Sequence, residues 1–87
     1  MATLPKDTNT TKEWKAYPNS SDFSGMVQNL CDSAVYMQVV TIGETPTEED
    51  GVVLPQGIGS HLPVTIPDTE ELVYKPVAAG PVTLRLA

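Results

Sequence analysis

The sequence predicts an all-β protein: a small antiparallel β-sandwich or jelly-roll-like barrel of about six short strands, with an extended N-terminal arm. From Gly25 onward, short runs rich in β-branched and aromatic residues alternate with turn residues about every ten positions. No segment shows a sustained helical period in its apolar residues. The N-terminal segment has a different composition, so we expect two regions, an arm over residues 1–24 and a β-sandwich over residues 25–87.

The first three expected strands lie between positions 26 and 54. Residues 26–30 form a short strand that ends at a turn-forming Cys-Asp-Ser sequence. Residues 34–42 follow with a dense content of β-branched and aromatic side chains, which suit a pleated sheet. The acidic segment 43–51 is bounded by glycines and is expected to be a loop. Residues 52–54 then form a very short strand.

The last three expected strands cover residues 61–66, 72–77 and 82–87. In the first of these, Leu62, Val64 and Ile66 alternate with polar positions, which predicts a strand with one buried face. The last strand alternates in the same way. Each strand is separated from the next by proline or glycine turns.

Two prolines predict where their strands lie. Pro63 and Pro76 both fall inside expected strands. Because proline has no backbone N–H to donate to a ladder, such strands occur at sheet edges or at bulges. We therefore expect both strands to be edge strands or to be interrupted.

Residues 1–24 are expected to be extended and mostly irregular, because their scattered apolar residues cannot offset the entropy of ordering the backbone. Spaced aromatic side chains on such a segment are typical of docking anchors. The candidate partner-binding residues are Leu4, Trp14, Lys15, Tyr17 and Phe23. The sequence leaves open the alternative that Trp14 and Phe23 fold back and cover the core of this domain.

Composition excludes several classes of function. The 87 residues include 5 Lys and Arg against 11 Asp and Glu, a net charge of −6, which argues against nucleic-acid binding. No apolar run approaches the length of a membrane span, and the N-terminal sequence does not resemble a signal peptide. A chain this short buries only about 60 % of its unfolded surface. Burial against a partner, or in a homo-oligomer, would therefore stabilise it.

The chemistry-bearing residues do not form a recognisable catalytic or metal-binding motif. His61 is the only histidine and is expected to face solvent, and Cys31 is expected to be a small turn or core residue. The acids at 48–50 lack the alternating spacing of a calcium loop, which favours a solvated loop. Residues 57–60 indicate a turn with positive φ at glycine, not a phosphate loop. We expect no enzymatic activity, no metal and no cofactor.

Two runs carry a resemblance to a known group of proteins. The segments NLCDSAVYMQ (29–38) and GETPTEEDGVVL (43–54) resemble small β-sandwich virion accessory proteins of tailed bacteriophages, of the capsid decoration or cement type. The likeness covers residues 25–87 and identifies no functional residue. It implies a structural protein that docks on the head shell and stabilises it through the N-terminal arm.

The same resemblance implies the partners and the location. The partners would be the major capsid protein or other virion subunits, and analogy suggests a trimer. The protein would be assembled in the host cytoplasm and reside on the virion. The alternatives are a receptor- or glycan-binding module, with residues 43–51 and 55–60 as its recognition loops, or a neck, tail or head-fibre accessory protein.

Overall fold

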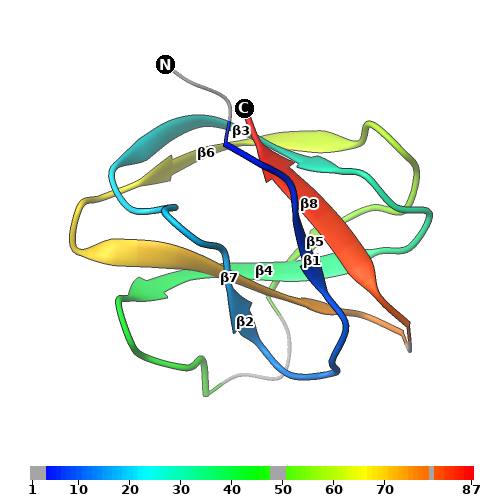
Figure 1. The fold of residues 1–87 in the computed structure, drawn as a ribbon, viewed down its shortest axis with the longest axis horizontal. Helices are drawn as coiled ribbons and strands as arrows, with labels where there is room; N and C mark the ends of the chain where they lie inside the picture. Colours follow the sequence, from blue (N-terminus) through cyan, green and yellow to red (C-terminus); the bar gives the residue numbers. More distant parts are fainter. Residues whose placement is uncertain (1–3, 48–50, 79) are drawn as a thin grey trace.

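The protein folds as two four-stranded antiparallel β-sheets that pack face to face (Figure 1). The computed structural model describes residues 4–47, 51–78 and 80–87. Within these residues the strands are β1 (Asp7–Asn9), β2 (Lys15–Ala16), β3 (Phe23–Asn29), β4 (Val35–Thr41), β5 (Val52–Leu54), β6 (His61–Ile66), β7 (Glu70–Pro76) and β8 (Val82–Leu86). The same part of the chain contains no helix that could cross a membrane.

The strand order is that of a jelly roll. One sheet, sheet A, has the order β1-β8-β3-β6, and the other, sheet B, has the order β2-β7-β4-β5. Each of the pairs β1–β2, β3–β4, β5–β6 and β7–β8 therefore crosses from one sheet to the other, and the pairs stack in register across the sandwich. The predicted all-β sandwich or jelly-roll-like fold is confirmed, with two strands more than expected.

The six expected strands are all present. β5 and β6 coincide with the predicted ranges 52–54 and 61–66, and the others differ by one to three residues at their ends. The largest shift is at β3, which begins at Phe23 because its buried positions, Phe23 and Val27, continue the inward alternation across Gly25.

The core lies between the sheets and consists of the inward positions of each strand. Val82, Leu84 and Leu86 of β8 are at most 1 % exposed and alternate with half-buried Thr83 and Arg85, as the sequence predicts. The cluster is completed by inward side chains of the other strands and by two aromatic residues from the N-terminal segment: Tyr17, Phe23, Val27, Val35, Met37, Leu54, Ile66, Leu72 and Tyr74.

The N-terminal segment is part of the sandwich, so the predicted boundary between residues 24 and 25 is wrong. β1 pairs with β8 and β2 pairs with β7, which gives each sheet an edge strand (Figure 1). Tyr17 is 1 % exposed and Phe23 5 % exposed. The segment has too few apolar residues to fold alone, but it orders by pairing its backbone with strands already formed and by burying these rings.

The two prolines behave differently. Pro63 lies on β6, an edge strand of sheet A, as predicted. Pro76 lies on β7, which runs between β2 and β4, so β7 is not an edge strand, but its pairing with β2 is interrupted before Pro76. The Val77 N–H supplies the bond to the Ala34 carbonyl on the β4 side, and β2 pairs only as far as Tyr74. The missing N–H of Pro76 therefore costs no ladder bond.

Candidate docking surface

The outer face of sheet B carries apolar and aromatic side chains where a solvent-facing sheet normally carries polar ones. Leu72 and Tyr74 of β7 and Met37 of β4 point into the core, so the residues between them point outward. The outward positions are Trp14, Ala16, Tyr36, Gln38, Val40, Val53, Glu71, Val73 and Lys75. We call the apolar and aromatic residues among them, together with Lys75, the aromatic face.

The strand register places four of these residues in one row across the sheet. Tyr36 of β4 pairs with Lys75 of β7 on one side and with Val53 of β5 on the other. Trp14 immediately precedes β2 and continues the row, and the Lys75 Nζ lies 4.9 Å from the centre of its ring. Lys75 is only 9 % exposed, so its ammonium is held against an aromatic ring in a cation–π contact.

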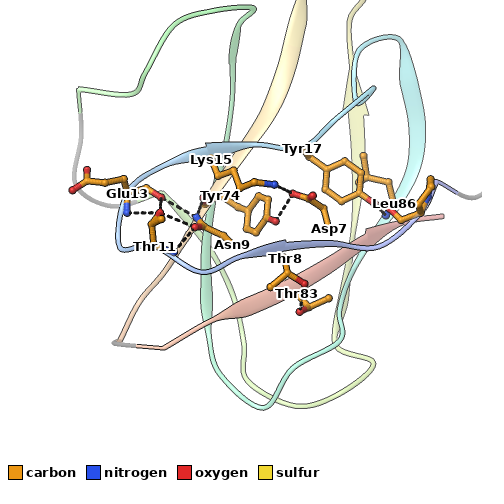
Figure 2. Close-up of polar contacts among 11 residues, drawn as sticks. Asp7, Thr8, Asn9, Thr11, Glu13, Lys15, Tyr17, Tyr74, Thr83 and Leu86 are labelled. Atoms are coloured by element: carbon orange, nitrogen blue, oxygen red, sulfur yellow. Dashed lines mark hydrogen bonds and ion pairs between the residues drawn. The ribbon is translucent and has the colours of Figure 1, made fainter.

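Trp14 faces outward because its neighbour Lys15 is held inward. The Lys15 ammonium forms an ion pair with the Asp7 carboxylate, which links the edge strands of the two sheets (Figure 2). The Tyr74 hydroxyl donates to the same carboxylate at 2.6 Å. Because alternate residues of a strand point to opposite faces, this tie directs the Trp14 ring onto the aromatic face.

A second tie fixes the chain just before Trp14. The Asn9 side-chain amide donates to the backbone carbonyls of Glu13 at 2.8 Å and Tyr74 at 3.0 Å (Figure 2). Its carbonyl oxygen accepts the Thr11 N–H at 2.9 Å. Asn9 is fully buried, so these bonds satisfy an amide that would otherwise destabilise the fold.

Tyr17 closes the same edge of the sandwich from within. Its hydroxyl donates to the Pro5 carbonyl and accepts the Leu86 N–H at 3.2 Å, and its backbone N–H donates to Leu72 at 2.8 Å. Burial raises the pKa of the Tyr17 phenol. Burial, followed by the hydrogen bond to the Asp7 carboxylate, raises the pKa of Tyr74. Both phenols therefore remain neutral and act as structural donors.

The predicted partner-binding residues separate into three places. Tyr17 and Phe23 lie in the core, and Leu4 is half-buried against it, so these three stabilise this domain itself. Lys15 is paired with Asp7 at the sheet edge. Trp14 alone lies on the aromatic face. For Phe23, the structure therefore shows the alternative in which the ring folds back and covers the core of this domain.

Sequence reasoning missed Tyr36, Val53 and Lys75 as members of a surface. The position of Tyr36 between Val35 and Met37 on a strand was a usable signal, because both neighbours are apolar and buried. No local signal could place Trp14 and Tyr36 on one face, because Trp14 precedes β2, Tyr36 lies on β4, and β7 runs between these two strands.

The remaining candidate residues do not come together. The Cys31 thiol donates to the Asn29 side-chain oxygen at 2.9 Å, and His61 is exposed with Nδ1 3.1 Å from the Gly59 carbonyl oxygen. The acids at 48–50 lie outside the described residues. Among the residues that the structure describes, no three potential metal ligands are grouped. Gly57 and Gly59 have φ of 121° and 94°, so the predicted positive-φ turn is confirmed.

A small apolar cleft opens at the opposite edge of the sandwich, between β5 and β6. Its volume is about 120 Å³, and its walls are formed mainly by aliphatic side chains of the two sheets, including Met37, Val39, Val52, Leu62, Val64 and Leu72. One edge of the sandwich is thus closed by polar ties and the other is open. Val52 lies in the cleft and Val53 on the aromatic face, so the two features adjoin along β5.

The fold and this surface together define a small jelly-roll sandwich with an apolar, aromatic outer face. Comparisons of the chain with protein-family models, curated proteins and solved structures gave no match.

Proposed function

We propose that this chain is a non-enzymatic structural protein that docks on another protein through the aromatic face. The observation that carries the proposal is the row in which Trp14 and Tyr36 flank Lys75 on the outer side of sheet B. Tyr and Trp are the side chains most often found as energetic anchors of interfaces. Val53, 48 % exposed, extends the row with apolar surface.

The surroundings of the row favour a protein partner. Val73 is 3 % exposed although it lies on an outer face, so neighbouring side chains, among which Gln38 is its partner on β4, close over it. The exposed apolar surface of this face is that of Val53 beside Tyr36. Surfaces of this kind mark interaction sites more often than solvent-exposed scaffold. The cleft beside β5 would admit one aliphatic side chain of the partner.

The partner we propose is the shell of a virion, in the manner of capsid decoration proteins of tailed bacteriophages. Jelly rolls are common among viral capsid domains, and the segments 29–38 and 43–54 resemble virion accessory proteins. Fold alone assigns no function. Because residues 4–24 belong to the domain, docking would use the face of sheet B and not a free arm.

A second candidate is a glycan-binding module. It is favoured by the placement of Trp14 and Tyr36 on the same face, since flat aromatic rings can stack on sugar rings, with Lys75 between them. Lectin domains also use the jelly roll.

Co-sedimentation with purified head shells tests the first candidate. Trp14→Ala and Tyr36→Ala should each weaken binding about tenfold or more, and Val53→Glu should do the same without removing a half-buried ring. Ile58→Ala is the matched control, because Ile58 is 77 % exposed on the β5–β6 turn. Equal binding by all four variants would overturn docking through this face. Binding to a glycan array without binding to shells would favour the second candidate.

A further inference from the structure

Among the residues that the structure describes, no acidic side chain lies on the outer face of sheet A, in a chain that has 11 acids. Its outward positions include Thr8, Met26, Gln28, His61, Pro63 and Arg85, and the others are serines and threonines. Lys6 stands two residues before Thr8 and is exposed on the same side by strand alternation. We call this set the sheet A face. It carries two cationic side chains and no acidic side chain.

The sheet A face has the layout of an interface. Gln28 pairs with Arg85 on one side and with His61 on the other, which forms a row of polar groups across three strands. The next outward pair, Met26 and Pro63, is apolar, and Met26 is 42 % exposed. The Arg85 Nε is buried and has no hydrogen-bond partner among the described residues. An apolar centre bordered by polar groups is typical of protein interfaces.

A complementary surface lies at one end of the same molecule. In the part of the chain that the structure describes, the connections β2–β3, β4–β5 and β6–β7, with the start of β7, carry Asp22, Glu44, Asp68, Glu70 and Glu71 and contain no Lys or Arg. We call these five residues, with Ile42, the acidic end. Ile42 is 52 % exposed among them.

Backbone hydrogen bonds hold the three connections of the acidic end together. The Asp22 N–H donates to Pro67 at 3.2 Å and the Ile42 N–H to Thr69 at 3.3 Å. The Glu71 carboxylate accepts the Gly43 N–H at 3.1 Å. The acidic end is therefore a set of hydrogen-bonded connections that carries several carboxylates and one exposed aliphatic side chain, that of Ile42.

We propose that the sheet A face of one copy receives the acidic end of a second copy. Ile42 would contact the Met26–Pro63 pair, and the surrounding carboxylates would meet Arg85 and Lys6. The two surfaces differ, so the contact is heterologous and either closes into a ring or extends as a chain. The contact does not use Trp14, Tyr36, Val53 or Lys75, which form the row proposed for docking on sheet B.

The salt dependence of this contact follows from two opposing effects. Copies with a net charge of −6 repel one another at long range, and this repulsion is screened beyond about 10 Å at 0.1 M salt. In a formed contact, opposite charges lie closer together than this screening length, so their attraction persists at 0.1 M salt. Association is therefore expected near 0.1 M salt and should weaken towards about 1 M, where the Debye length is only about 3 Å.

Sedimentation velocity of the full chain over a concentration series tests the proposal. We expect concentration-dependent oligomers that Arg85→Glu converts to monomer. Lys12→Glu is the matched control, because it makes the same change in net charge on an exposed residue outside both surfaces. Glu44→Lys combined with Asp68→Lys should also give monomers, and mixing this variant with Arg85→Glu should restore association.

The outcomes are distinguishable. A wild-type chain that remains monomeric at all concentrations and salts overturns the proposal. Equal effects of Arg85→Glu and Lys12→Glu also overturn it, because only the net charge would then matter. Circular dichroism identifies a variant that fails to fold, and the charge-reversed acidic end then supplies the independent test. Binding of head shells by a monomeric Arg85→Glu variant would separate this contact from docking by sheet B.

Discussion

Asn9 and Asn29, twenty positions apart, make equivalent hydrogen bonds where β1 and β3 cross from sheet A to sheet B. Each side-chain amide donates to the carbonyl four residues later, of Glu13 at 2.8 Å and of Ser33 at 2.7 Å. Each also donates to a second carbonyl, that of Tyr74 on β7 at 3.0 Å or that of Pro55 after β5 at 3.1 Å. Both asparagines are fully buried.

The equivalence extends to the residues two positions later. The side-chain oxygen of Asn9 accepts the backbone N–H of Thr11 at 2.9 Å and its hydroxyl at 2.8 Å. That of Asn29 accepts the backbone N–H of Cys31 at 2.9 Å and its thiol at 2.9 Å. The Cys31 thiol thus occupies the place of the Thr11 hydroxyl. This hydrogen bond gives a structural reason for the cysteine at position 31.

Replacing either buried asparagine should destabilise the protein strongly. Asn29→Ala leaves two carbonyls and two donors without their partner, so we expect a loss of about 2–4 kcal/mol. Urea unfolding followed by circular dichroism measures it. Asn19→Gly is the control, since Asn19 is exposed with φ of 60° and should change stability by less than about 0.5 kcal/mol. A similar loss of stability in Asn29→Ala and Asn19→Gly would argue that the hydrogen bonds of Asn29 do not stabilise the fold.

Cys31→Thr should be tolerated, because a hydroxyl can donate to the Asn29 oxygen as the thiol does. We expect a change of less than about 0.5 kcal/mol. Cys31→Val has a similar size and no donor, so it should cost about 1–2 kcal/mol. The same unfolding experiment compares the two variants. If valine were as stable as threonine, the thiol would contribute packing only.

Stability should fall as the solution becomes alkaline. The pKa values of the Tyr17 and Tyr74 phenols are raised in the folded state, so the folded chain retains protons that the unfolded chain releases. The stabilisation that these two protonated phenols provide is complete below a pH of about 10, which is the ordinary pKa of tyrosine. It is lost as the pH rises above that pKa. Melting temperatures measured from neutral pH upward should show the fall.

Tyr74→Phe should flatten that alkaline fall. The variant also removes the hydroxyl bonded to Asp7, which should cost about 1–2 kcal/mol at neutral pH. Tyr36→Phe is the matched control, because Tyr36 lies on the outer face of sheet B. An unchanged alkaline profile in Tyr74→Phe would show that this phenol does not carry the effect.

Deleting residues 1–24 should abolish cooperative folding. The deletion removes the edge strands β1 and β2 and takes Tyr17 and Phe23 out of the core. Truncating one buried Phe costs about 3–5 kcal/mol, which is close to the whole stability of a small domain. Thermal melts of residues 25–87 should show no sharp transition, and a synthetic peptide of residues 1–24 should restore it. A soluble, cooperatively melting 25–87 fragment would contradict this role of the segment.

The class of fold and the position of most strands could be predicted from local patterns in the amino-acid sequence. In β6 and β8 the alternation of apolar and polar residues reports directly which side is buried, because side-chain direction repeats every two residues. Turn glycines such as Gly57 were equally readable, since positive φ is a local property.

The role of the N-terminal segment depends instead on contacts between distant parts of the chain. Tyr17 is buried because its hydroxyl meets Pro5 and Leu86, and the second of these lies at the far end of the chain. Trp14 and Tyr36 lie on the same face of sheet B because of the register in which β7 pairs with β2 and with β4. Neither segment encodes this register alone. Alternation is a local property of the chain, whereas register and strand order arise from pairing between distant segments.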